Sequence, residues 1–284
     1  MSSIYHEDIL AANVSLHSKL AESYDTDEPH FRDENIDYVR KILKTLVDDT
    51  RAERLLDLGC GTGFILRIAW FLLNHLDGVD ATPAMMAKVP QPPPGVKLNL
   101  YHSDTGVFEP NKNTYDIVTA YSFLHHLFDM KPTLNTAYAA LRPGGKFYID
   151  LEPNYYFWDA IKSINHSTDL DPIVLREMKM LKDGAIQFPE ALGVTDTIFN
   201  RAEYGKNILG GIAEDKFTSL LASVGFKDII VLYRWFIGEG QLINEPSRPK
   251  VDNLAIAANV EATLQKALPL SRSLFKYVGF IATK

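Results

Sequence analysis

The fold of this chain is decided by residues 54–63, which read RLLDLGCGTG. The short apolar run Arg54–Leu58, closed by glycines, is typical of a buried strand that enters a tight turn. Gly59, Gly61 and Gly63 follow at alternate positions. Glycine tolerates positive φ and has no Cβ, so a flat polar ligand can lie against such a turn while N–H groups at the start of the next helix point toward it. The stretch therefore predicts a ligand site where a strand meets a helix.

Outward from this turn, strands and helices are expected to alternate. Apolar residues at helical spacing predict helices at 36–46, 64–73, 83–88 and 131–141. Short apolar runs, the last of them preceded by a turn at 142–145, predict strands at 54–58, 76–80, 96–102, 115–120 and 146–151. Continuous alternation implies right-handed crossovers and a parallel sheet covered on both faces. The predicted fold class is a doubly wound α/β sheet.

The alternation breaks after Glu152. Residues 153–213 carry many aromatic side chains without a clean pattern, which suggests a covering segment. A helix at 214–224, a strand at 227–236, a helix at 252–267 and a strand at 277–283 then return the chain to the sheet. We expect one interrupted core, with an N-terminal helical lid at 1–50, a cofactor-binding core at 51–152, a substrate-side cap at 153–213, and the returning core at 214–284.

Composition excludes several other classes of protein. The chain has 284 residues, of which 46% are hydrophobic, and a single cysteine. These values exclude disordered, collagen-like and disulfide-framework proteins, and a lone Cys60 favours a reducing compartment. The start of the chain does not resemble a signal peptide and no apolar run reaches about 18 residues, so a cytoplasmic protein without a membrane span is expected. Lys and Arg number 29 against 36 Asp and Glu, and the resulting charge of −7 argues mildly against a phosphate-binding surface.

Two common phosphate-binding patterns do not fit the glycine turn. A dinucleotide fingerprint requires G-x-G-x-x-G or G-x-G-x-x-A, but the third glycine comes one position early, and no Gly-Lys-Ser/Thr of a phosphate loop follows. The sequence instead closely resembles the class I S-adenosylmethionine-dependent methyltransferases, whose first motif, D-x-G-x-G-x-G, matches 57–63. Other family landmarks follow in order at 78–80, 103–105, 115–120, 141–145 and, less closely, 214–226.

The resemblance implies a Rossmann-like, seven-stranded sheet that is mostly parallel, with its last strand antiparallel. It also implies S-adenosyl-L-methionine as cofactor and S-adenosyl-L-homocysteine as product. Asp80, 21 positions after Gly59, suits two ribose hydroxyls. Asp104 would face the adenine amine, or cap a helix instead. The implied cofactor contacts are Tyr24, Asp57, Gly59, Cys60, Gly61, Thr62, Gly63, Asp80, Ala81, Met85, Ser103, Asp104, Thr105, Ala120 and Tyr121, with Cys60 as a packing residue and not a nucleophile.

The catalytic candidates follow the fourth predicted strand and are Tyr121, His125 and His126. Methyl transfer depends mainly on alignment, which can supply about 7–11 kcal/mol, whereas a general base adds a factor of about 10²–10⁴. Neighbours on a helix differ by about 100°, so one histidine should point inward and is the candidate base. A histidine that only forms hydrogen bonds is equally consistent with the sequence. No metal is expected, because adjacent histidines on a regular helix cannot share one ion.

Substrate selection is assigned to the lid and the cap. Tyr24, His30 and Phe31 are candidate lid residues. In the cap, the candidates for walling an apolar pocket or holding an acid group are Tyr155, Tyr156, Trp158, Arg201 and Tyr204. Tyr155, Tyr156 and Trp158 are equally consistent with core beneath the cap.

The leading hypothesis is methyl transfer to oxygen or nitrogen of a small molecule. A peptide or protein methyltransferase and a non-catalytic subunit that binds the cofactor are the alternatives. A nucleic-acid substrate is disfavoured, since the chain is acidic and has no Asn/Asp-Pro-Pro-Tyr/Phe pattern after the fourth strand. The sequence indicates no oligomeric state.

Overall fold

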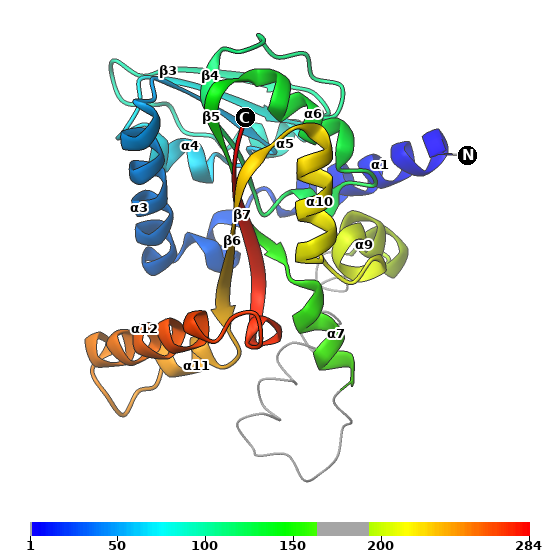
Figure 1. Cartoon of the computed structure of the whole chain (residues 1–284). Coiled ribbons are helices and arrows are strands. Elements are labelled where there is room, and N and C mark those ends of the chain that lie inside the picture. The colour runs from blue at the N-terminus through cyan, green and yellow to red at the C-terminus, as the bar shows by residue number, and fades with distance from the viewer. Residues whose placement is uncertain (1, 164–192) are drawn as a thin grey trace.

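A computed structural model describes residues 2–163 and 193–284. These residues form a seven-stranded sheet with the order β3-β2-β1-β4-β5-β7-β6 (Figure 1). The strands are β1 (Arg54–Leu58), β2 (His75–Asp80), β3 (Lys97–His102), β4 (Tyr115–Tyr121), β5 (Leu141–Pro153), β6 (Lys227–Phe236) and β7 (Phe275–Thr283). Strands β1 to β5 pair in parallel, and β7 lies between β5 and β6, antiparallel to both. The predicted fold class is confirmed.

Helices cover both faces of this sheet. On one face lie α3 (Asp33–Thr50) and α4 (Phe64–Ala69), and on the other lie α6 (Lys131–Ala140) and α10 (Glu214–Val224), as Figure 1 shows. Within β1, Leu55 belongs to the core under α3 and Leu56 to the core under α6. A strand that is buried on both faces has no polar side to alternate with, which explains the continuous apolar run.

The remaining elements are shorter or lie at the ends of the sheet. They are α1 (Ser2–Leu20), α2 (Tyr24–Asp27), α5 (Pro83–Met86), α7 (Tyr155–Ser163), α9 (Asp196–Ala202), α11 (Glu239–Ile243) and α12 (Lys250–Lys266), with the single turns η1 (Pro29–Phe31), η2 (Leu124–His126), η3 (Tyr204–Ile208) and η4 (Arg272–Leu274). Helices α4 and α5 end earlier than the sequence predicts. In the described part of the chain, no helix combines the length and the apolar character that crossing a membrane requires.

One predicted turn is part of a strand. Residues 142–145 lie within β5, although their sequence predicts a turn. The backbone N–H of Gly144 donates to the carbonyl of Lys284, and the N–H of Lys284 donates to the carbonyl of Gly145, both at 3.0 Å. Pairing with the end of the chain therefore includes this segment in the strand, although Gly144 keeps a positive φ of 80°. A local pattern cannot reveal a partner so distant in sequence.

The segments predicted as an N-terminal lid and a cap pack against each other. Helix α1 contacts α9 through a small apolar core made of Ala12, Leu16, Leu20, Val194, Phe199 and Ala202. Helix α9 belongs to the segment predicted as a cap, of which residues 164–192 lie outside the described residues. Lid and cap thus meet beside the carboxyl ends of the parallel strands.

Candidate functional site

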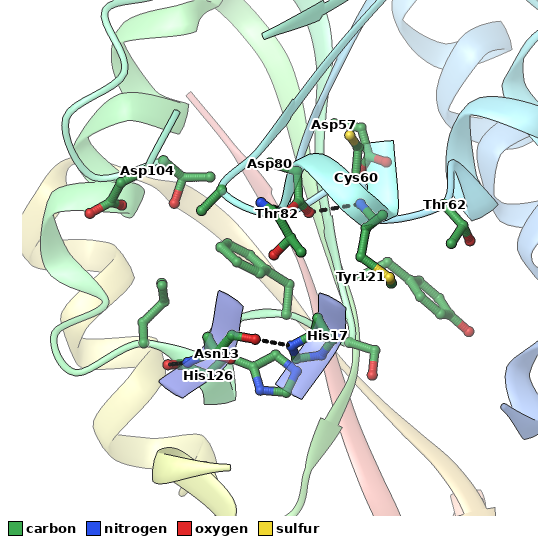
Figure 2. Close-up of a pocket in the computed structure, with 18 of the residues that line it drawn as sticks. Asn13, His17, Asp57, Cys60, Thr62, Asp80, Thr82, Asp104, Tyr121 and His126 are labelled. Atoms are coloured by element: carbon green, nitrogen blue, oxygen red, sulfur yellow. Dashed lines mark hydrogen bonds between the residues drawn. The ribbon is translucent and has the colours of Figure 1, made fainter. Parts of the chain in front are cut away.

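A cavity opens where the glycine turn follows β1, at the carboxyl ends of β1, β2 and β4 (Figure 2). We call it the turn cavity. Its empty volume, which includes space open to solvent, is about 920 Å³. Asp57, Asp80 and Tyr121 lie on the side of the sheet, while Asn13 and His17 of α1 form the opposite wall. The strand order reverses at β1, and parallel α/β sheets bind ligands at such a point.

The glycine turn has the backbone that its sequence requires. Gly59, Gly61 and Gly63 have φ values of 74°, 51° and 87°, a region that residues with a Cβ rarely adopt. The N–H of Gly59 donates to the carbonyl of Val79 at 2.8 Å, which ties the turn to β2. A Cβ on Gly59 would lie 2.2 Å from the ring of Phe123. No larger residue fits at this position without displacing that ring.

Asp80 holds the turn from the neighbouring strand. Its Oδ2 accepts from the N–H of Gly61 at 2.8 Å, and its Oδ1 accepts from the N–H of Thr82 at 2.7 Å. A carboxylate offers about four lone-pair sites, so two remain for a ligand in the turn cavity. Two neighbouring hydroxyl groups, such as those of a ribose, suit this arrangement.

Asp57 is a buried acid at the start of the turn. Its side chain accepts a hydrogen bond from the hydroxyl of Thr119 at 2.6 Å. Burial raises the pKa of Asp57 to about 7, although the bond from Thr119 lowers it. A cationic group in the cavity would favour the ionised form. Asp57 therefore suits an ammonium group.

The lid is fastened to the turn by Asp25 of α2. Asp25 accepts from the hydroxyl of Thr62 at 2.6 Å and pairs with Arg67 at 2.7 Å. These contacts hold the neighbouring Tyr24 in the wall of the turn cavity. The lid therefore touches the ligand space directly.

Asp104 meets the lid at the other end of the turn cavity. Its Oδ2 lies 2.8 Å from Nε2 of His6 in α1, and its Oδ1 accepts from the N–H of Gly106 at 2.8 Å. Asp104 therefore stabilises a turn, close to the capping role considered from the sequence. It also lines the cavity beside Thr105.

A second cavity, the outer cavity, is bordered by the lid, the cap and the returning core, including Glu28, Trp158, Phe199 and Glu203. Four residues line both cavities and are His17, Tyr24, Ser122 and His126. The two cavities therefore adjoin each other at these side chains.

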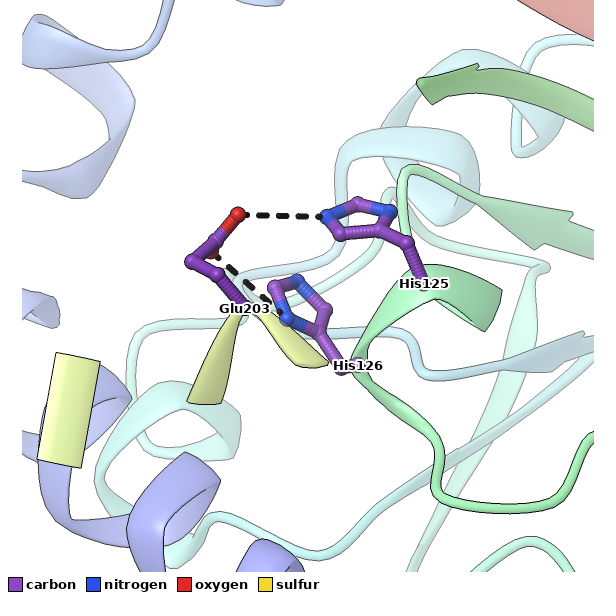
Figure 3. A group of neighbouring side chains, drawn as sticks. All are labelled: His125, His126 and Glu203. Atoms are coloured by element: carbon purple, nitrogen blue, oxygen red, sulfur yellow. Dashed lines mark ion pairs between the residues drawn. The ribbon is translucent and has the colours of Figure 1, made fainter. Parts of the chain in front are cut away.

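The two predicted histidines lie beside this meeting point, in η2. Nδ1 of His125 lies 2.8 Å from Oε2 of Glu152, and Nδ1 of His126 lies 2.7 Å from the carbonyl oxygen of Ala202. Only His126 borders the turn cavity, as expected for one inward histidine. Figure 3 shows that both rings nevertheless face Glu203, whose carboxylate oxygens lie 3.8 Å from Nε2 of His125 and 3.7 Å from Nδ1 of His126.

The surroundings shift the pKa values of the two imidazoles in opposite directions. Burial lowers the pKa of His125, but the charge and hydrogen bond of Glu152, with the charge of Glu203, raise it more, so it lies above its ordinary value. Burial, followed by the charge of His125, holds the pKa of His126 well below its ordinary value. Near neutral pH His126 is therefore uncharged, and its Nδ1 carries the proton because the carbonyl of Ala202 can only accept.

The structure gathers most of the predicted cofactor residues. The turn cavity is lined by Tyr24, Asp57, Gly59, Cys60, Gly61, Thr62, Asp80, Ala81, Met85, Asp104, Thr105 and Tyr121. Three candidates do not line either described cavity. Gly63 begins α4, the hydroxyl of Ser103 donates to the carbonyl of Asp104, and Ala120 lies in the core.

Tyr121 is a wall of the cavity and is poorly suited to accept a proton. Its hydroxyl oxygen accepts a hydrogen bond from Nδ2 of Asn35 at 2.8 Å. Burial raises its pKa far above the ordinary value of 10. We therefore retain Tyr121 for its ring and not for its phenol.

The substrate candidates are mostly engaged elsewhere. Trp158 borders the outer cavity, as does the lid candidate Phe31, while His30 lines the turn cavity. The other four border neither described cavity. Tyr155 packs against Tyr156, whose hydroxyl donates to Asp215 at 2.8 Å. Arg201 pairs with Asp8 at 3.6 Å, and Tyr204 packs against Phe128.

Sequence reasoning missed several residues around both cavities. His6, Asn13 and His17 reach the turn cavity from α1, and no motif marks them. Glu203 comes from the cap, and its role depends on where the cap folds. Glu152 alone carries a signal that could have been used, because an acid at the carboxyl end of a parallel strand is placed like Asp80.

Comparison with known proteins agrees with this geometry. Residues 56–147 match the family model described as a methyltransferase domain. A probable S-adenosylmethionine-dependent methyltransferase of Mycolicibacterium smegmatis is 23% identical over 146 residues, which are 49% of this chain and 54% of the relative. A ubiquinone biosynthesis O-methyltransferase of Pseudomonas savastanoi is 24% identical over 50% of this chain and 68% of the relative. The chain thus matches about half to two thirds of the length of these relatives.

A solved S-adenosylmethionine-dependent methyltransferase of Mesorhizobium loti shares the fold, with a TM-score of 0.51 and 17% identity over 88% of this chain and all of that one. Residues 56–147 thus carry a methyltransferase domain, and these similarities support a class I S-adenosylmethionine-dependent methyltransferase. The predictions of family, enzyme class and cofactor are confirmed. The turn cavity fits the cofactor, because Asp80 has free lone pairs for hydroxyls and Asp57 suits an ammonium group.

Proposed function

We propose that this chain methylates an oxygen or nitrogen of a small molecule that enters the outer cavity. The observation that carries the proposal is the contact between the two cavities at His17, Tyr24, Ser122 and His126. A cofactor in the turn cavity and an acceptor in the outer cavity could approach each other there. When bound, S-adenosyl-L-methionine supplies a methyl group activated by the positive charge on its sulfur.

The side chains of the turn cavity bind and orient the cofactor. Asp80 accepts hydrogen bonds from its ribose hydroxyls, and Asp57 accepts from its ammonium group. Asp104 and Thr105 lie where the adenine would be, with Met85 and Ala81 as the apolar wall. Tyr24 closes the cavity from the lid and excludes water. Alignment of this kind supplies most of the rate enhancement expected for an in-line displacement.

The histidine pair activates the acceptor. A hydroxyl or a protonated amine must lose a proton when it is methylated, and His125 and His126 are the titratable pair at the meeting point of the cavities. An N-methyltransferase and an O-methyltransferase both occur among the relatives, namely phosphoethanolamine N-methyltransferase 2 of Caenorhabditis elegans and the ubiquinone biosynthesis enzyme. Both enzyme names support a small-molecule acceptor, and experiment must decide whether its oxygen or its nitrogen is methylated.

Two measurements test the proposal. Titration calorimetry with S-adenosyl-L-homocysteine should show one site per chain with a Kd in roughly the micromolar range. With a panel of phenols, alcohols and amines as acceptors, the chain should then form S-adenosyl-L-homocysteine only when a suitable acceptor is present. Folded protein that binds no cofactor, or that binds it and methylates peptides but no small molecule, would contradict the proposal.

A further inference from the structure

Three side chains beside the meeting point of the cavities are arranged like the ligands of a metal ion. His125 and His126 come from η2 and Glu203 follows α9, and one donor atom of each lies within 4.8 Å of the other two. The two measured nitrogen to oxygen distances are 3.8 and 3.7 Å. Ligands at about 2.0–2.1 Å from a tetrahedral Zn²⁺ stand about 3.3 Å apart. The two distances end on different oxygens of Glu203, Oε2 and Oε1. Binding such an ion would therefore need a contraction of about 0.5 Å along each distance, with the carboxylate either binding through both oxygens or rotating to present one of them.

We propose that His125, His126 and Glu203 bind one divalent transition-metal cation, with Zn²⁺ as the reference ion. Two imidazoles and one carboxylate suit such ions better than Mg²⁺ or Ca²⁺, which prefer oxygen ligands. The sequence argument against a metal assumed a regular helix. Residues 124–126 form one tight turn, and both imidazoles face the same carboxylate across it.

The way in which His125 is held supports this role. Its Nδ1 bonds to Glu152, whose Oε1 also accepts from the backbone N–H groups of Phe123 and Leu124 at 2.9 and 2.8 Å. Metal-binding histidines usually donate their second ring N–H to a carboxylate or a carbonyl. This bond leaves the lone pair on Nε2, the nitrogen nearer Glu203. Nδ1 of His126 must lose its proton and its hydrogen bond to the carbonyl of Ala202 before it can bind the cation.

The charges around the cluster favour a cation. Glu152 and Glu203 supply two carboxylates, and Glu28 lies in the same cavity wall. Lys206, whose Nζ lies 3.9 Å from Oε2 of Glu203, is a positive group beside them. The Lys206 side chain is 33% exposed, so it can turn toward water when an ion enters.

Three protein ligands leave coordination positions open for an acceptor. A cation here would bind the acceptor oxygen and lower its pKa, so the histidine pair would activate the acceptor through the cation and not by accepting its proton. This would favour oxygen over nitrogen as the methylated atom. This consequence rests on the proposed function, whereas the binding of the ion does not.

The test is titration of the full, tag-free chain with Zn²⁺ by calorimetry, and with Co²⁺ by its visible absorption. His125→Asn keeps a donor where Nδ1 bonds to Glu152 but removes Nε2, and Glu203→Gln keeps the size of the side chain but removes its charge. His75→Asn, at an exposed histidine that begins β2, is the matched control. Cofactor binding is measured in every variant, because His125 and Glu203 do not line the turn cavity.

The expected result is one Zn²⁺ per chain in the parent and in His75→Asn, with affinity at least about tenfold weaker in the two ligand variants and unchanged binding of S-adenosyl-L-homocysteine. A parent chain without stoichiometric Zn²⁺, or ligand variants that bind it as the parent does, would overturn the proposal. A parent that binds Zn²⁺ but no cofactor would instead contradict the proposed function.

Discussion

Asp80 gives the sharpest prediction about the turn cavity. Replacing it by alanine removes the acceptor for two ribose hydroxyls, and a hydrogen bond to a charged group contributes about 1.5–3 kcal/mol. Two such bonds amount to about 3–6 kcal/mol, so the affinity for S-adenosyl-L-homocysteine should fall by at least about 10²-fold. Asp80→Asn, which retains one acceptor oxygen, should fall between the parent and Asp80→Ala.

The same substitution also affects the protein without ligand. Asp80→Ala loses the bonds from the N–H groups of Gly61 and Thr82, which should lower the free energy of unfolding by about 1–2 kcal/mol for each. Calorimetry must therefore accompany a thermal melt that shows the variant folded. Asp48→Ala, at an exposed acid paired with Lys44 at 2.8 Å, is the control and should bind normally. Folded Asp80→Ala that binds within threefold of the parent would refute the assigned role.

Three further predictions concern the turn and the lid. The pKa of Asp57 rises from 3.8 to about 7 on folding, so the cofactor-free chain should lose up to about 4 kcal/mol of stability as pH rises through this window. In urea unfolding at pH 4 to 8, Asp57→Asn should remove most of that loss, and it should also weaken cofactor binding. An unchanged pH profile of stability would argue against a buried Asp57 that ionises in this range. Gly59→Ala should destabilise the chain by about 2–5 kcal/mol, since it combines a positive φ with a clash against Phe123. The control Gly144→Ala, with a similar φ of 80° and open space at its Cβ, should cost only about 1–2 kcal/mol. Equal losses of stability in the two variants would show that the clash contributes nothing. Asp25→Ala removes the contacts of Asp25 with Thr62 and Arg67. Because exposed ion pairs contribute about 0.2–1 kcal/mol, stopped-flow measurements should show cofactor dissociation only a few-fold faster than in the parent. An unchanged dissociation rate would mean that other contacts hold the lid.

The cofactor side of the site was largely predictable from sequence. The glycine turn and the acid that ends β2 are fixed by local chemistry, because positive φ demands glycine and a strand end places its side chain at the edge of the sheet. Asp57, Asp80 and Thr105 could therefore be assigned before the structure. Ser103 and Ala120 were assigned from position in a motif alone, and they line neither described cavity.

The acceptor side was much less predictable. The candidates Tyr156 and Arg201 were chosen because polar and aromatic groups are conspicuous in the cap, yet they bind Asp215 and Asp8. Residues 164–192 of the predicted cap lie outside the described residues. Side chains in a covering segment have no periodic constraint, so their direction depends on packing that no short pattern encodes.

By itself the sequence determined the parallel sheet, the place of the ligand turn and the class of cofactor, because each depends on residues adjacent in the chain. Tertiary structure alone decided that α1 supplies His17 to the wall of the turn cavity, that Lys284 pairs with the start of β5, and that Glu203 lies opposite both histidines. These contacts join segments far apart in sequence, and their geometry is set by how the lid and cap pack over the sheet. The cluster from which the metal site is inferred exists only because that packing brings η2 and the end of α9 together.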